Sequence, residues 1–184
     1  MTGTEMYRNL IGVMMVFLLL SGMIQGAGAA GSSSITFSGD ILPPAPYIDV
    51  SISGSIENWM FQTGTNEDIT SVDMTVDSNM NSWSVGAMDA LTGSKPSGTA
   101  GKMAEWSDSA YVPSGHVLAN AMQVKSGTGS YITLSGTNLP VQAGTAPGIT
   151  SYAIGMKQQI EQTDPTLQGG HQYRVVITFT GAAA

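Results

Sequence analysis

The sequence predicts an all-β protein, an antiparallel two-sheet β-sandwich of the Ig-like or Greek-key type, preceded by an N-terminal signal peptide. Charged residues make up 10 % of the 184 residues, against a usual share of about 25 %. Apolar and polar residues alternate in short runs along the chain. Segments rich in Gly, Ser and Pro separate these runs, which is typical of strands joined by turns.

The first 29 residues resemble a secretory signal peptide. Arg8 precedes an apolar run over residues 10–20, and the small residues Ala27, Gly28 and Ala29 follow. A membrane span needs roughly 20 apolar residues, so we favour a cleaved signal over an anchor. We expect cleavage before or near Ala30, export of the chain, and no transmembrane span after cleavage.

Residues 30–46 are expected to form an N-terminal strand and a Pro-rich spacer. Within residues 34–41, the apolar side chains Ile35, Phe37 and Ile41 share one face of an alternating run. Residues 43–46 contain three prolines, which make a stiff, extended spacer. The strand either pairs within its own domain or is donated to the sheet edge of a neighbouring copy. Both alternatives stay open.

Residues 47–184 are expected to form the β-sandwich domain. Turns are expected at residues 64–68, 93–101, 126–129 and 169–170, and a short helix is expected at residues 157–162. Strands are expected at residues 48–53, 72–77, 83–86, 131–134, 152–157 and 173–180.

Composition and motifs argue against an enzyme or a nucleic-acid-binding protein. A net charge of −7 with six Lys and Arg residues does not provide a cationic surface. The chain contains no cysteine, so thiolate nucleophiles, disulfides and cysteine metal sites are excluded. The two histidines, His116 and His171, are expected to be solvated loop residues, and no Gly-x-Ser-x-Gly motif is present.

Asp77, Asn79 and Asn81 are a weak calcium candidate. Their spacing is that of the first ligands of a calcium loop, but the closing position is occupied by Met88 and the turn glycine is missing. A strand end followed by an Asx-rich turn is the favoured interpretation. No other cofactor is expected.

The tryptophans divide into a core residue and a candidate binding residue. Trp83 has the same strand phase as Val85, which predicts burial. Trp106 lies close to the polar loop at residues 93–101, where an exposed ring would stack on a sugar.

Two segments resemble the WxL-like exported β-sandwich proteins of prokaryotic cell surfaces, of the kind found in methanogens. Residues 78–85 read Ser-Asn-Met-Asn-Ser-Trp-Ser-Val, an Asn-rich turn followed by a Trp-x-apolar strand. Residues 169–180 form a Gly-containing turn and a Thr-rich terminal strand. The resemblance implies a non-catalytic role at the cell surface or in the extracellular matrix.

The sequence therefore predicts a secreted, non-catalytic structural protein of the cell surface. We expect it to form homo-oligomers or polymers that assemble into a filament, sheath or layer, with strand donation as one route of assembly. The alternative is an adhesion module that binds cell-wall or matrix polysaccharide through Trp106.

Overall fold

The structure is a computed structural model that describes residues 44–184. The expected signal peptide and the expected strand with Ile35, Phe37 and Ile41 lie outside the described residues. Residues 44–184 are all-β, with antiparallel pairing in every sheet and no helix in this part of the chain. Accordingly, no helix within these residues is long and apolar enough to cross a membrane.

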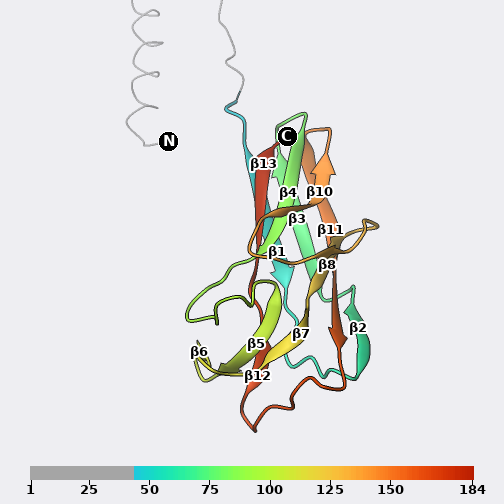
Figure 1. The fold of residues 1–184 in the computed structure, drawn as a ribbon. Helices are drawn as coiled ribbons and strands as arrows, with labels where there is room; N and C mark the ends of the chain where they lie inside the picture. Colours follow the sequence, from blue (N-terminus) through green and yellow to red (C-terminus); the bar gives the residue numbers. More distant parts are fainter. Residues whose placement is uncertain (1–43) are drawn as a thin grey trace, which may run out of the picture. The chain divides into compact units, whose positions relative to one another are not determined.

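The largest sheet has the order β1-β3-β11-β8-β9 (Figure 1). Its longest strand pairs on one side first with β3 and then, farther along, with β2. Its strands are β1 (Ile48–Gly54), β2 (Gly64–Asp68), β3 (Val72–Ser78), β8 (Gln123–Ser126), β9 (Ile132–Thr133) and β11 (Gly148–Ile160).

Two smaller sheets complete the fold. One has the order β10-β4-β13 and consists of β4 (Trp83–Asp89), β10 (Leu139–Gly144) and β13 (Ile177–Ala183). The other has the order β12-β5-β6, with β7 also paired to β5. Its strands are β5 (Lys102–Ser107), β6 (Ala110–Tyr111), β7 (Val117–Ala121) and β12 (Gln172–Arg174).

The core lies between the inner faces of these sheets. On β3 and β4, alternate residues are buried because successive side chains of a strand point to opposite faces. Trp83 is 3 % exposed, which confirms its expected place in the core, and its Nε1 donates a hydrogen bond to the Ala146 carbonyl at 3.1 Å. The buried apolar residues of the two strands are Val72, Met74, Val76, Trp83, Val85 and Ala87.

Two expectations for local structure are wrong for one reason. Residues 157–160, expected to be helical, form the end of β11, and residues 64–68, expected to be a turn, form β2. The two segments pair with each other, with Lys157 opposite Glu67 and Gln159 opposite Thr65. Pairing between segments so far apart in the sequence leaves no local sequence pattern. The polar composition of both segments therefore wrongly indicated a turn and a helix.

The expected strand at residues 173–180 is divided into two. Its first part forms β12 and pairs with β5, whereas its second part forms β13 and pairs with β4. The chain passes from one sheet to the other at Val175 and Val176, which lie outside both strands. The alternation of apolar and polar residues continues through this crossover. It therefore did not indicate that the pairing strand changes from β5 to β4.

Replacing Trp83 with alanine tests the position of the core. The substitution removes a buried indole and leaves a cavity, so we expect the free energy of unfolding to fall by about 3–5 kcal/mol. Chemical denaturation followed by circular dichroism measures the change. Met60, which is 88 % exposed, supplies the control, because Met60→Ala should alter stability by less than about 0.5 kcal/mol. Equal effects of the two substitutions would contradict this description of the core.

Candidate functional site

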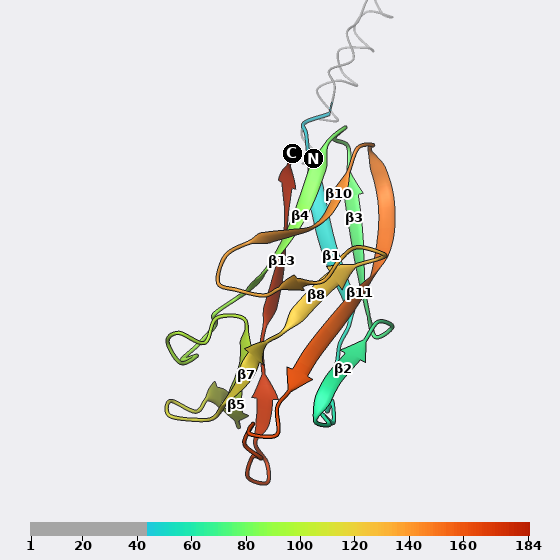
Figure 2. The ribbon, with the colours of Figure 1, turned by 45° about the vertical axis from the view of Figure 1, so that its right-hand side comes forward.

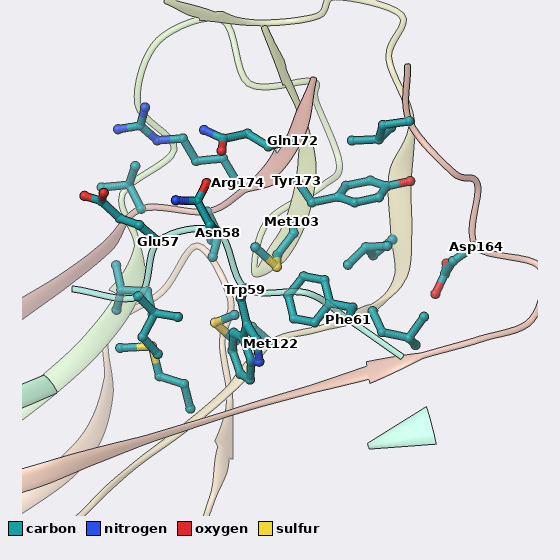
Figure 3. A pocket seen from close by; sticks show the side chains of 18 of the residues that line it. Glu57, Asn58, Trp59, Phe61, Met103, Met122, Asp164, Gln172, Tyr173 and Arg174 are labelled. Atoms are coloured by element: carbon teal, nitrogen blue, oxygen red, sulfur yellow. The ribbon is translucent and has the colours of Figure 1, made fainter. Parts of the chain in front are cut away.

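A large cleft, lined by both apolar and polar side chains, opens between the ends of the sheets. Its volume is about 1150 Å³, and its walls come from β1, β3, β5, β7, β11, β12 and β13 together with the connecting segments (Figure 3). The cleft is open because the end of β1 is not covered, and Ile52 is 43 % exposed there. The apolar lining residues are Ile52, Ile56, Trp59, Phe61, Val72, Met103, Leu118, Met122, Met156, Ile160, Pro165, Leu167, Tyr173, Val175, Val176, Ile177 and Phe179. Charged and polar side chains, among them Glu57, Asp164 and Arg174, line the rest of the cleft.

The segment between β1 and β2 lies along the cleft. Trp59 and Phe61 are half-buried and pack against the core, with ring centroids 4.9 Å apart. Asn58 precedes them with a φ of 55°, an uncommon conformation for a residue other than glycine. Among the described residues, the backbone of residues 55–61 makes no hydrogen bond with another part of the chain. This segment is therefore held mainly by its apolar side chains.

Two unpaired strand edges lie beside the cleft. β1 pairs only with β3, and β13 pairs only with β4. The two strands contact each other, and a Cβ atom at Gly181 would meet Ile48 and Val50. They lie next to each other in Figure 1, whereas in the view of Figure 2 β4 is drawn between them. No ladder of backbone hydrogen bonds joins β1 to β13. Within residues 44–184 the outer edge of β13 thus keeps free hydrogen-bonding groups beside the cleft.

The residues considered for calcium have another role at the start of the described chain. The Asn79 side-chain amide donates to the Ala45 carbonyl at 2.9 Å, and its oxygen accepts from the Tyr47 backbone N–H at 2.8 Å. The Tyr47 hydroxyl donates to the Asp77 carboxylate at 3.0 Å. Asn81 is exposed. Asp77 and Asn79 therefore fix the direction in which the Pro-rich spacer leaves the domain.

No group of three or more His, Asp or Glu residues in the described part of the chain is placed to hold a metal ion. A second observation also argues against calcium at the three candidate residues. The side-chain oxygen and the side-chain NH2 group of Asn79 are both already engaged in hydrogen bonds to the backbone. The weak calcium candidate remains a prediction.

Trp106 is packed rather than open. Its ring is half-buried, meets the Tyr111 ring edge-on with centroids 5.0 Å apart, and lies 4.1 Å from the Arg174 guanidinium carbon. An arginine stacked on an indole is a favourable cation–π contact. A sugar would have to displace Arg174 to reach that face of the ring. Polysaccharide binding at Trp106 remains a prediction.

The two histidines lie near one carboxylate. His116 is exposed, as expected, but His171 is only half-buried, and its Nδ1 is 2.5 Å from an oxygen of Glu105. Glu105 also accepts a hydrogen bond from the His116 backbone N–H at 2.7 Å. His171 lies in a loop, as expected, but its ring is only partly exposed because the pairing of β12 with β5 brings it next to Glu105.

The cleft itself was missed in the sequence. The residues that line it come from segments spread from Ile52 to Phe179, and no motif joins them. The one local signal is the group Ile56, Trp59 and Phe61 in a segment without strand periodicity. Large apolar side chains clustered in an irregular segment indicate that the segment packs on an apolar surface elsewhere in the fold.

Comparisons with known proteins identify no family. No family model matches the chain. No curated protein matches it either. Among solved structures, a chain from a chaperone–usher pilus, in a study of how the pilus rod uncoils, aligns with a TM-score of 0.43 and 13 % identity. The alignment covers 87 % of this chain and 100 % of that chain. Identity at this level transfers no residue's role from one protein to the other.

Stability should depend on pH through Glu105. The His116 backbone N–H, and after it the His171 ring, hold the pKa of Glu105 below its ordinary value of about 4.5. A carboxyl whose pKa is lower in the folded state stabilises the fold above its unfolded pKa, and this contribution is lost as the pH falls through the folded pKa. The difference in unfolding free energy between wild type and Glu105→Gln should therefore shrink as the pH falls below about 4.5.

Denaturant unfolding between about pH 3 and pH 7 measures this difference. This range includes the pH values over which carboxyl groups titrate. Glu57→Gln is the matched control because Glu57 is exposed. A difference for Glu105→Gln that does not change with pH would show that its hydrogen bonds do not favour the ionised form.

Proposed function

We propose that this protein is a non-catalytic structural protein of the cell surface, exported and self-assembling into an extracellular filament, sheath or layer. In the proposed assembly, residues 34–41 of one copy add a strand along β13 of the next and place apolar side chains in its cleft. The observation that carries the proposal is the large cleft, with its many apolar lining residues, beside the unpaired edge of β13.

The cleft and the strand edge are complementary to the N-terminal segment. β13 is a seven-residue strand, and residues 34–41 form an alternating run of similar length. Backbone groups on a strand edge pair with an added strand, while its alternate side chains enter the cleft. Ile35, Phe37 and Ile41 are on the face that would enter.

The free energy available is of the right size for association. Burial of one large apolar side chain contributes about 1.5–3 kcal/mol, so three contribute about 5–9 kcal/mol. Association costs about 4–15 kcal/mol of translational and rotational freedom. Side-chain burial alone does not exceed the upper part of that range. Hydrogen bonds along the edge of β13 are therefore needed as well, at about 0.5–1.5 kcal/mol each.

The spacer leaves the domain at the end opposite the cleft. β1 begins at Ile48, opposite Ser78, and β13 ends at Ala183, opposite Trp83. The cleft is lined instead by Ile52 near the end of β1 and by Ile177 at the start of β13. The Asn79 amide holds the spacer at this far end. Donation to another copy needs no reversal of the chain, whereas pairing at home requires residues 34–41 to turn back past β1.

Deletion of residues 35–41 tests the proposal. The chain from Ala30 onward should form ordered polymers, and the deleted chain should stay monomeric, because it retains the cleft but has no strand to donate. Negative-stain microscopy and light scattering measure the outcome. Polymers of unchanged size after deletion would contradict strand donation.

Single substitutions within the segment separate side-chain burial from a general effect of the N-terminus. Phe37→Ser should weaken association by about tenfold or more, since a buried aromatic side chain is lost. Thr36→Ser is the matched control, because Thr36 lies on the opposite face of the strand. Equal effects of the two substitutions would mean that Phe37 does not enter the cleft.

A further inference from the structure

An ion pair between Lys95 and Asp89 is buried at the end of β4. The Lys95 ammonium contacts Asp89 Oδ2, and each side chain is 1 % exposed. Asp89 is the last residue of β4, and Lys95 belongs to the loop that leads to β5. The loop is tied down by a hydrogen bond from Ser94 Oγ to the Tyr111 carbonyl at 3.3 Å. Water is therefore excluded from both charged groups.

Two backbone N–H groups hold the Asp89 carboxyl group. Leu91 N–H donates to Oδ1 at 3.1 Å, and Gly101 N–H donates to Oδ2 at 2.8 Å. A preorganised donor such as Leu91 N–H stabilises the oxyanion that forms on Oδ1 when a nucleophile attacks the carboxyl carbon, and Gly101 N–H holds Oδ2 in place. Gly101 has a φ of 78°, and a Cβ there would lie 1.9 Å from the Leu134 carbonyl oxygen, so its position is fixed.

The ring of Tyr111, whose hydroxyl has no hydrogen-bond partner in the described part of the chain, is buried near the pair. Tyr111 is 2 % exposed, and its hydroxyl has no hydrogen-bond partner among the described residues. The Lys95 Nζ atom lies 5.8 Å from the centroid of the Tyr111 ring. Burial, and secondarily the charge of Asp89, raise the pKa of Tyr111. A buried hydroxyl that makes no hydrogen bond costs free energy, so the fold gains no stability from this group.

From this arrangement we propose that Lys95 and Asp89 condense to form an intramolecular isopeptide bond. A nucleophile, an acyl carbon, one backbone donor at each carboxyl oxygen and the buried Tyr111 ring lie together, shielded from solvent. Holding the two reacting groups in contact replaces an encounter between separate molecules, which favours reaction strongly. The bond also removes two buried charges, whose desolvation is costly. This proposal does not depend on the proposed function.

The reaction balances without an added reagent. A proton passes from the Lys95 ammonium to the Asp89 carboxylate, which gives an amine and a carboxylic acid. The amine lone pair attacks Cγ from above the carboxyl plane, and the negative charge develops on Oδ1, where Leu91 N–H donates. Tyr111 then takes a proton from Nζ and returns its own to the departing Oδ2. The Cγ–Oδ2 bond breaks, one water molecule leaves, and the Cγ–Nζ amide remains.

Intact mass spectrometry of the chain from Ala30 onward, with tandem analysis of its peptides, tests the proposal. The mass should be lower than the sequence mass by one water molecule, and the loss should map to a closed ring between Asp89 and Lys95. The sequence mass, unchanged after prolonged incubation of the folded chain, would overturn the proposal. A water loss that maps to a succinimide at an aspartate would also overturn it.

Variants assign the roles of the groups. Lys95→Arg should retain the full sequence mass, because a guanidinium does not condense, and a water loss that persists in it would contradict the link. Asp89→Asn should lose ammonia in place of water. Tyr111→Phe should fold and slow bond formation by about 100-fold, the usual size of a proton-transfer contribution. An unchanged rate of bond formation in Tyr111→Phe would show that the Tyr111 hydroxyl does not relay the proton.

Discussion

The unpaired edges of β1 and β13 are the constraint on which the rest of the structure depends. Backbone N–H and C=O groups need hydrogen-bond partners, and sheet edges supply none for one side of a strand. In the described residues the two edges lie side by side, but only side chains join them. The sandwich therefore stays open below this contact, and a cleft of about 1150 Å³ with many apolar lining residues remains. A strand from another copy would satisfy the edge and cover the cleft in one step, so we infer that the fold is completed by assembly.

The buried polar residues have a different task from the apolar core. Asp89 and Glu105 lie at or near strand ends, and each accepts backbone N–H groups from a neighbouring loop. They fix long connections that have no regular structure of their own. In a chain without cysteine, disulfides are not available for this purpose. The proposed amide between Lys95 and Asp89 would supply a covalent connection at one of these places.

Much of the fold could be predicted from alternation of residue type, but the partners of the strands could not. Trp83 and Val85 share one strand phase, which correctly indicated burial. Asp89 has the same strand phase as these two residues, and this phase indicates burial, although a charged side chain is usually exposed. By contrast, β2 is polar and becomes a strand only because β11 is beside it. The cleft is formed by residues from distant segments, and its size depends on how the sheets diverge, which local pattern does not encode.

Disulfide trapping between two different copies tests the claim of strand donation most directly. The sequence contains no cysteine, so only the introduced cysteines can form disulfides. Chains carrying only Phe37→Cys are mixed with isotope-labelled chains carrying only Ile177→Cys, and oxidised products are identified by mass. Strand donation predicts an efficient mixed disulfide, and far less of it when Thr36→Cys replaces Phe37→Cys. The contradicting result is no mixed disulfide, together with rapid closure within single molecules of a chain that carries both Phe37→Cys and Ile177→Cys. That result would mean that the strand pairs within its own domain.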